Sequence, residues 1–272
     1  IHDTAILIDN KIIEEPSFQL RYKGLLIHNS KIKDNIVFKK GTPRKLRNLD
    51  GSVLSLLTGG AGNENYFHWL SDVLPRIALC NRTVNLSEID YFLLPDDVKK
   101  FQSETLDCLN IPKNKRLSSK KFRHIKAKKL IVTDHPVVTS IGNIKDTHNV
   151  PAWIIIWLRN AFLNKNIQTG KKNKVYIDRS ETTNNFRSSR FISNEDEIKK
   201  YLLKNNFILA KLHEMKFSEQ IDLFYNAECI VGLHGAGLAN IVFCKPGTRV
   251  IELMNTNTSS HFEIIAKKNN LN

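Results

Sequence analysis

The sequence predicts an α/β protein with two domains, each built on a parallel sheet covered by helices. The 272 residues suit two domains of about 100–150 residues each. Short apolar segments alternate with longer segments of helical character in both halves, and parallel strands need such crossovers. A stretch over 134–150, marked by Pro136, Gly142 and the following Pro151, separates the halves. We therefore place the domains at 1–150 and 151–272.

In the first half, apolar runs predict strands and the intervening segments predict helices. The expected strands are 53–59, 91–95 and 129–133, and the expected helices are 64–80 and 96–110. Pro75 should kink or restart the first helix, because proline lacks the N–H group that a helix needs. Asp96 and Asp97 should form an acidic first turn in the second helix.

The second half repeats the alternation more clearly. The expected strands are 174–178, 207–211, 229–233 and 249–253, and the expected helices are 151–164, 194–206, 218–228, 237–244 and 260–269. Asn194 is a typical N-cap residue. The acidic residues 195–197 that follow it would stabilise the helix by interacting with the positive end of the helix dipole. These acids are therefore interpreted as dipole partners and not as metal ligands.

The composition describes an ordinary soluble protein with a large excess of positive charge. Hydrophobic residues make up 41% and charged residues 25%, and no apolar run approaches the roughly 18–20 residues of a membrane span. Lys and Arg number 41 against 27 Asp and Glu, a formal net charge of +14. The cysteines lack zinc or CxxC spacing, which favours buried reduced thiols in a reducing compartment. They are Cys80, Cys108, Cys229 and Cys244.

Much of the positive charge lies in the basic stretch 113–129, KNKRLSSKKFRHIKAKK. Such a stretch could bind nucleic acid, anionic lipid headgroups or a phosphorylated substrate, or form a solvated surface loop. Aromatic residues barely interleave it and no nucleic-acid motif is present, so no nucleic-acid partner is expected. Two interpretations of this stretch stay open: peripheral contact with a membrane or a lipid-linked acceptor, and a solvated surface loop without a partner.

The segment 231–240, VGLHGAGLAN, joins an apolar strand to a helix without any formal charge. Ligands bind at this carboxyl end of strands in open parallel sheets. Gly235 and Gly237 would let the backbone approach a ligand, the helix start would offer N–H groups to a phosphate, and His234 could donate to the same group. Alternatively, the glycines only relieve crowding between helix and strand, and His234 is a satisfied core residue.

A second cluster follows the strand at 174–178 and contains Arg179, Arg187 and Arg190. Arginines at the carboxyl end of a strand can hold a diphosphate in a bidentate manner. A third cluster lies in the helix expected over 64–80, where His68 and Asp72 are four residues apart and share one face. Such a pair suits a general base with an orienting partner, or an ion pair without a role.

Other chemistries lack their sequence signatures. The chain contains no HExxH, no clustered histidines and no Asp-x-Asp, so a metal site is not expected. No G-x-S-x-G elbow is present, which argues against a serine hydrolase. Neither GxGxxG nor a Walker A motif occurs.

Taken together, the motifs resemble glycosyltransferase family 61. The resemblance rests on NYFHWLSDVLPR, the spaced arginines before NEDEI, FSEQI and VGLHGAGLANIVFCKPGTRVIEL, in this order. The family includes plant β-1,2-xylosyltransferase, the O-GlcNAc transferase of extracellular EGF domains and bacterial capsular-polysaccharide proteins. The resemblance implies a GT-B-type fold, in which two Rossmann-like domains with parallel sheets face each other across a cleft.

The resemblance also implies an inverting, metal-independent transferase that moves a sugar from a nucleotide sugar, with UDP expected, to a glycan or polysaccharide hydroxyl. No cofactor is implied, since the nucleotide sugar is a substrate. The catalytic base would be Asp72 or His68, and the acceptor side would include Asn65 and Arg76. The donor or its diphosphate would be bound by Arg179, Arg187, Arg190, His234, Gly235, Ala236, Gly237, Asn240 and Glu252, the last as a ribose partner.

The chain stops at Asn272, soon after the helix expected over 260–269, whereas chains of this family continue, which leaves open whether the donor domain is complete. We expect a cytoplasmic enzyme, peripheral at the inner face of the membrane if the basic stretch binds lipid. Two alternatives remain: a basic protein of this fold that binds an anionic polymer, and a related transferase of another group, such as pyruvyl.

Overall fold

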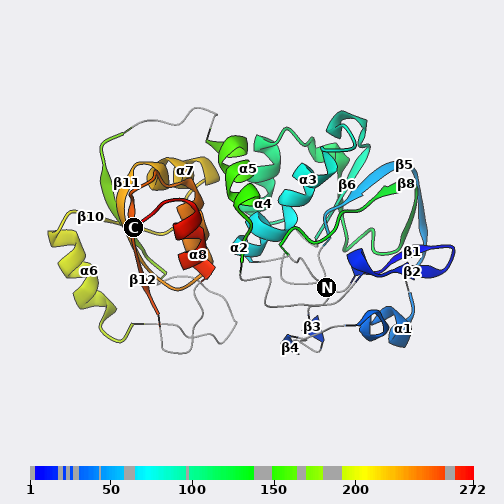
Figure 1. Cartoon of the computed structure of the whole chain (residues 1–272), viewed down its shortest axis with the longest axis horizontal. Helices are drawn as coiled ribbons and strands as arrows, with labels where there is room; N and C mark the ends of the chain where they lie inside the picture. Colours follow the sequence, from blue (N-terminus) through cyan, green and yellow to red (C-terminus); the bar gives the residue numbers. More distant parts are fainter. Residues whose placement is uncertain are drawn as a thin grey trace. The chain divides into compact units, whose positions relative to one another are not determined.

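The computed structural model of the chain describes residues 4–17, 21–22, 25–26, 31–42, 44–57, 65–95, 98–137, 149–163, 170–179, 192–254 and 261–272. The chain divides into two compact units, Ile1–Ile154 and Ile155–Asn272. Each unit contains one four-stranded parallel sheet together with helices (Figure 1). The predicted α/β class is confirmed. Most of the linker expected over 134–150 lies outside the described residues.

The sheet of the first unit has the order β7-β6-β5-β8. Its strands are β5 (Arg47–Ser55), β6 (Tyr91–Leu94), β7 (Arg116–Ser118) and β8 (Ile125–Ile131). All neighbouring strands are parallel. The chain first moves outward from β5 to β7 and then returns to place β8 on the other side of β5. The strand order therefore reverses between β5 and β8.

Strand β5 begins at Arg47, earlier than the expected residue 53. The polar residues before Val53 suggest a loop, but they form a β-bulge, because the register with β8 shifts between Leu49 and Ser52. Asp90 accepts a hydrogen bond from the Ser52 N–H there at 2.7 Å. A Cβ atom on Gly51 would lie 2.8 Å from the Asp90 carboxylate, so glycine fits this close approach.

The basic stretch 113–129 is not the solvated loop considered as its alternative. It contains β7 and the first part of β8, which begins at Ile125 instead of residue 129. Arg116 is fixed by internal contacts: its Nη2 lies 2.5 Å from Asp107, and its Nε donates to the Ile111 carbonyl at 3.1 Å. Lysines dominate β8 because an edge strand tolerates them and they discourage pairing with other chains.

The helix expected over 64–80 is interrupted, as Pro75 predicts. It consists of α2 (Tyr66–His68), the π-helical turn η3 (Trp69–Val73) and α3 (Pro75–Cys80). The Leu74 N–H bonds to the Trp69 carbonyl at 3.0 Å, five residues back. Because Pro75 has no N–H group, the helix accommodates the break as a π-turn. The fully buried Trp69 donates its indole N–H to Thr105 at 2.9 Å.

Thr105 belongs to α4 (Lys100–Cys108), which starts later than the expected residue 96. The Lys99 N–H bonds to the Gln102 side chain at 2.7 Å and so marks the helix start. Asp96 and Asp97, expected in the first turn, lie outside the described residues.

The chain before β5 forms small elements. They are β1 (Ile6–Ile8) and β2 (Lys11–Ile13) in a hairpin, the pair β3 (Arg21–Tyr22) and β4 (Leu25–Leu26), and α1 (Val37–Lys40). Asn35 is almost fully buried, and its amide donates to the carbonyls of Thr4 at 2.8 Å and Ser17 at 2.6 Å. This one side chain therefore ties the segment before α1 to the hairpin region.

The sheet of the second unit has the order β10-β9-β11-β12, again fully parallel. Its strands are β9 (Asn173–Ile177), β10 (Phe207–Ala210), β11 (Ala227–Leu233) and β12 (Arg249–Leu253). The four predicted strands are thus confirmed within one or two residues at each end. Here the strand order reverses between β9 and β11.

Helices pack on both faces of this sheet. They are α5 (Ala152–Phe162), which runs in from the first unit, α6 (Glu195–Lys204), α7 (Phe217–Tyr225), the 3₁₀ helix η7 (Ala236–Phe243) and α8 (His261–Lys268). Leu202 of α6 packs against Tyr176 on one face. Gly237 of η7 approaches Ile177, the next residue of β9, on the other face. The helix expected over 237–244 is therefore present, but it is a 3₁₀ helix.

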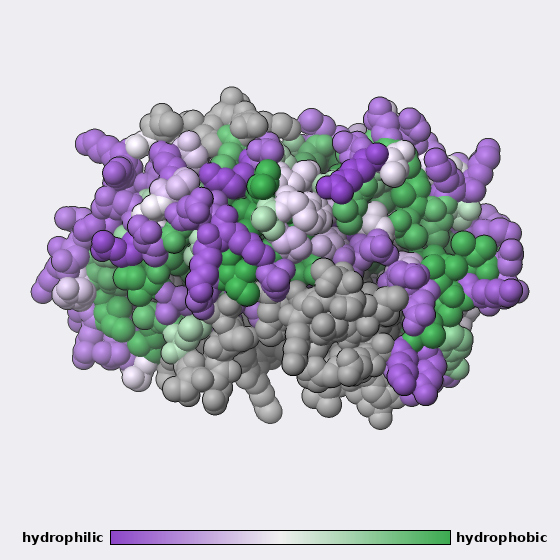
Figure 2. All heavy atoms as spheres, in the orientation of Figure 1, coloured by the Kyte–Doolittle hydropathy of each residue, from purple (hydrophilic) through white to green (hydrophobic). Residues whose placement is uncertain are grey.

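The surface is mainly hydrophilic, with smaller apolar areas on the face drawn in Figure 2. No helix within the described ranges is long and apolar enough to cross a membrane. The four cysteines, all in described parts of the chain, form no disulfides; three are buried as predicted, whereas Cys108 is only half-buried.

Candidate active site

In both sheets, candidate residues gather at the point where the strand order reverses. Ligands of open parallel sheets bind beyond the carboxyl ends of the strands at such a point. In the first unit this point lies between β5 and β8, and in the second between β9 and β11. Each unit therefore presents its own group of candidate side chains.

His68 and Asp72 form the central pair of the first unit. The Nδ1 atom of His68 is 2.5 Å from Oδ2 of Asp72, so the i, i+4 spacing does bring them together. The Asp72 side chain is 7% exposed, whereas that of His68 is 24% exposed. Since a carboxylate accepts, we assign the imidazole proton to Nδ1, and Nε2 remains as the proton-accepting atom.

Asp72 is ionised despite its burial. Burial disfavours the charged carboxylate, yet the pKa of Asp72 lies below its ordinary value because of the charge and hydrogen bond of His68 and the charges of His135 and Arg76. Its second oxygen lies 3.2 Å from the Ser71 hydroxyl, which also donates to the Phe67 carbonyl at 2.9 Å. Asp72 is thus arranged to orient His68 and to stabilise a positive charge on it.

Arg76 was assigned to the acceptor side together with Asn65. Its guanidinium is buried and donates from Nε to the Asp72 carbonyl at 3.0 Å and from Nη1 to the Thr133 carbonyl at 3.1 Å. Burial lowers the pKa of Arg76 to about 10, so it remains a cation at neutral pH. In this structure Arg76 joins the helix to the segment after β8, and its contact with an acceptor stays a prediction.

His135 is a member of this cluster that the sequence did not single out. It follows β8, is 8% exposed and feels the charges of Asp72, Arg76 and His68. Burial, partly opposed by Asp72, lowers the pKa of His135 to about 4, so the ring is neutral at physiological pH. The sequence around His135 contains no motif that would indicate a functional role. His135 lies near Asp72 only because β8, which precedes it, pairs with β5.

Asn65 was assigned to the acceptor side, and the structure gives it a local role. Its side-chain oxygen accepts from the Phe67 N–H at 2.9 Å and from the His68 N–H at 3.4 Å, which makes it the N-cap of α2. Asn65 therefore fixes the start of the helix that carries His68. The glycine-rich residues before it lie outside the described residues.

In the second unit, Arg179 crosses from the end of β9 to the end of β11. Its Nη1 donates to the His234 carbonyl at 2.9 Å. A Cβ atom on the next residue, Gly235, would lie only 2.6 Å from this Nη1 and 3.0 Å from Cζ. The glycine is therefore needed for the guanidinium to lie across the loop. A positive charge and a bare backbone meet at the reversal point of the sheet.

His234 forms a second histidine–carboxylate pair. Its Nδ1 atom is 2.5 Å from Oε1 of Glu252 on the neighbouring strand β12, and both side chains are largely buried. The rings of Phe262 and His261 of α8 lie 5.4 and 6.3 Å from the His234 ring. Glu252, expected as a ribose partner, is therefore already engaged through Oε1 and directs the Nε2 edge of His234 away from β12.

The remaining loop residues divide into accessible and buried positions. Gly235, Ala236 and Gly237 are half-buried. A Cβ atom on Gly237 would lie 3.0 Å from Leu212, so this glycine also relieves crowding. Asn240 is fully buried and donates to the Gln220 side chain at 2.9 Å, so it joins η7 to α7.

The acidic first turn of α6 contacts the end of β9. Lys199 pairs with Asp178 at 2.9 Å and with Glu195 at 3.4 Å, and the Tyr176 hydroxyl donates to Glu195 at 2.9 Å. This network fixes the backbone just before Arg179. Asn194 is the N-cap residue, but its side chain makes no capping bond. Arg187 and Arg190 lie outside the described residues.

Within the described part of the chain, no three His, Cys, Asp or Glu side chains are grouped closely enough to hold a metal ion. The positive charges described at the two reversal points are those of Arg76 and Arg179. The arrangement offers a partly exposed imidazole oriented by a carboxylate in one unit, and an arginine beside an open glycine backbone in the other.

Comparison with known proteins agrees with the resemblance in the motifs. The family model described as Glycosyltransferase 61 matches residues 66–251, about two thirds of the chain. A β-1,2-xylosyltransferase of Arabidopsis thaliana is 36% identical over 63 residues. This match covers 23% of the present chain and 12% of the plant protein, so only a small part of that protein is represented.

Proposed function

The chain belongs to glycosyltransferase family 61, and we propose that it transfers a sugar from a nucleotide sugar, with UDP as the nucleotide, to a hydroxyl of a glycan or polysaccharide. The observation that carries this proposal is the contact of Arg179 with the His234–Gly235 backbone at the reversal point of the second sheet. That point is where open parallel sheets bind nucleotides.

On the donor side, Arg179 supplies formal charge and residues 235–237 supply backbone N–H groups for the diphosphate. Arginine suits this task because its planar fork matches two phosphate oxygens. His234, oriented by Glu252, adds a donor from Nε2 when it is protonated. These groups stabilise the negative charge that develops on the leaving diphosphate without a metal ion. Arg187 and Arg190 are proposed to join them.

On the acceptor side, His68 is the proposed general base and Asp72 its orienting partner. The greater exposure of His68 and the burial of Asp72 support this assignment over the reverse. Nε2 of His68 takes the proton of the acceptor hydroxyl while the hydroxyl oxygen forms a bond to the anomeric carbon. The bond from that carbon to the diphosphate oxygen breaks, and its electron pair leaves with the diphosphate. One displacement inverts the anomeric centre.

The fold proposed with this reaction is of the GT-B type, with the acceptor in the first unit and the donor in the second. It is supported by the presence of one parallel sheet in each unit, each with candidate groups at its carboxyl end. A cytoplasmic enzyme that meets a lipid-linked acceptor at the membrane would use the basic stretch 113–129 for that contact.

The donor site can be tested by the thermal shift that UDP produces in the presence of a chelator. We expect UDP to raise Tm without metal, and Arg179→Ala to weaken UDP binding about 10- to 100-fold, the usual loss for a charge-assisted hydrogen bond. Arg249→Ala is the matched control, because Arg249 is exposed at the opposite end of the same sheet. Equal effects of the two substitutions, or no shift with any nucleoside diphosphate, contradict the donor site.

The base can be tested separately. His68→Ala should lower the transfer rate about 100- to 10,000-fold, as loss of a general base does, and leave UDP binding unchanged. Added imidazole should restore part of the rate. His213→Ala, which removes an exposed histidine, serves as the control for the loss of an imidazole group. Full activity of His68→Ala together with inactivity of Asp72→Asn would return the role of base to Asp72.

A further inference from the structure

Two basic segments that are distant in the sequence lie side by side in the first unit. The Arg47 N–H bonds to the His124 carbonyl at 2.9 Å, and Nδ1 of His124 donates to the Arg44 carbonyl at 2.9 Å. Arg47 and Ile125 are direct partners in the β5–β8 pair. The segments 44–47 and 119–127 therefore form one continuous surface, which we call the basic face.

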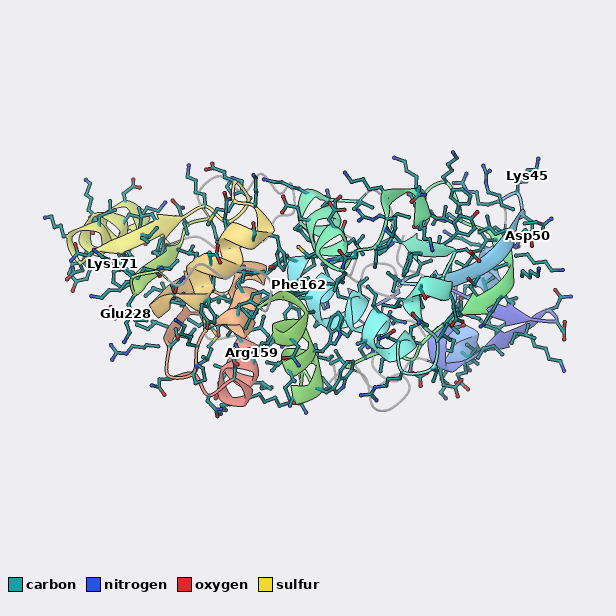
Figure 3. All side chains as sticks on the ribbon, turned by 90° about the horizontal axis from the view of Figure 1, so that it is seen from above. Lys45, Asp50, Arg159, Phe162, Lys171 and Glu228 are labelled. Atoms are coloured by element: carbon teal, nitrogen blue, oxygen red, sulfur yellow. The ribbon has the colours of Figure 1, made fainter. Side chains whose placement is uncertain are left out.

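The basic face carries a dense and one-sided charge. Its two segments contain seven Lys and Arg residues and no Asp or Glu. The exposed cations include Arg44, Lys45, Arg47, Lys121 and Lys126. Figure 3 labels Lys45 and Asp50, which lie on either side of the start of β5. Asp50 lies at the border of the basic face, where it pairs with Lys128 at 3.7 Å in a fully solvated contact that neutralises little.

Part of this charge is held in place by Phe122. The Arg47 guanidinium lies 5.4 Å from the Phe122 ring centroid, and the Lys121 ammonium lies 5.9 Å from it. Both distances are within cation–π range. Phe122 is half-buried between them, so its ring is not presented for stacking against a nucleic-acid base. The basic face therefore lacks the aromatic platform that single-stranded nucleic acid uses.

The basic face does present an apolar side chain. Leu46 is 44% exposed and stands between Lys45 and Arg47. A cluster of cations around an exposed leucine fits an anionic bilayer, because the cations meet headgroup phosphates while the leucine enters the interface. Neither a soluble polyanion nor a small phosphate would gain from Leu46.

We propose that the basic face, residues 44–47 with 119–127, docks this protein onto anionic phospholipid bilayers. The surface includes only part of the basic stretch 113–129 and adds a segment that precedes it by about 75 residues in the sequence. It lies at the amino ends of β5 and β8, whereas His68 follows the carboxyl end of β5. Docking therefore leaves the carboxyl end of this sheet uncovered. The inference does not depend on the proposed function, because binding requires no nucleotide.

The test is co-sedimentation with vesicles of phosphatidylcholine alone and with about 30 mol% phosphatidylglycerol at about 0.1 M salt. We expect binding only to the anionic vesicles. The variant Arg44→Ser/Lys45→Ser/Lys121→Ser/Lys126→Ser should lower the partition coefficient by about 100-fold or more, since each basic residue contributes roughly fivefold. Leu46→Ser should lower it a few-fold while leaving its salt dependence unchanged.

The matched control removes the same charge from exposed lysines of the second unit, in Lys171→Ser/Lys172→Ser/Lys200→Ser/Lys204→Ser. This variant should bind vesicles within a few-fold of wild type. Equal losses in the two quadruple variants would show that net charge alone acts and would overturn the proposal. Failure of wild type to bind anionic vesicles, or binding to single-stranded RNA in preference to them, would overturn it too. A cooperative thermal unfolding transition with a Tm close to that of wild type shows that the variants are folded.

Discussion

The buried histidine at position 135 makes the first unit sensitive to acid. In the unfolded chain a histidine takes up a proton with a pKa near 6.5, whereas burial lowers the pKa of His135 in the folded protein to about 4. Above pH 6.5 both states hold the neutral ring, and His135 has no effect on the pH dependence. As the pH falls from 6.5 towards 4, only the unfolded state gains the proton, and the first unit loses stability.

The size of this loss follows from the two pKa values. Proton linkage gives a loss of about 2 kcal/mol between pH 7 and pH 5, and about 3 kcal/mol once the pH reaches 4. The Asp72 carboxylate acts in a different pH range. Its pKa in the folded protein lies below the value near 3.8 expected for the unfolded chain, so its contribution to stability is complete above pH 3.8 and is lost only as the pH falls further. The interval from pH 7 to pH 5 therefore isolates His135 from Asp72.

The measurement is amide hydrogen exchange of β5 and β6, which reports the opening of the first unit, at pH 7 and pH 5 after correction for intrinsic rates. In wild type the free energy of opening should fall by about 2 kcal/mol over this interval. His135→Gln should remove most of this pH dependence, whatever it does to stability at pH 7. His213→Gln, which changes an exposed histidine, controls for the substitution. A His135→Gln variant with the full wild-type pH dependence would refute the reasoning.

Three further substitutions test single contacts. Gly235→Ala places a methyl group where the Arg179 Nη1 lies. Because the end of an arginine side chain can move, Tm without ligand should change little. The displaced guanidinium should lower UDP affinity, measured by calorimetry, at least about 10-fold. Thr105→Val removes the acceptor of the buried Trp69 indole and should cost about 1–3 kcal/mol in denaturant unfolding; an unchanged midpoint would contradict the contact. Lys199→Met leaves the Asp178 carboxylate without its nearest cation, and a loss of stability at pH 7 that shrinks at low pH is expected; no loss at pH 7 would contradict that pairing.

The sequence predicted the second unit well because its signals are local. Apolar runs of five to seven residues bounded by turn residues define β9, β11 and β12, and each strand needs no information from elsewhere in the chain. The i, i+4 spacing likewise predicted the contact of His68 with Asp72, since a helical turn fixes it.

Other features depend on residues that are distant in the sequence, and the sequence alone could not supply them. The early start of β5 depends on Asp90, which accepts from Ser52 across the bulge. The place of His135 beside Asp72 depends on β8 lying next to β5. The contact of Glu252 with His234 depends on the register of β12, which places Glu252 opposite Gly232. The role of Glu252 as a ribose partner stays a prediction.

The close approach of Arg179 to Gly235 has a consequence for how sequences of this family can diverge. With the guanidinium in place, the space above position 235 is already filled, so a side chain added there first would displace the guanidinium and weaken the proposed donor site. If residue 179 becomes small, that space empties and the requirement for glycine disappears. The two positions should therefore vary as a pair: homologues that keep the arginine should keep the glycine, and homologues with a larger residue at 235 should have lost the arginine.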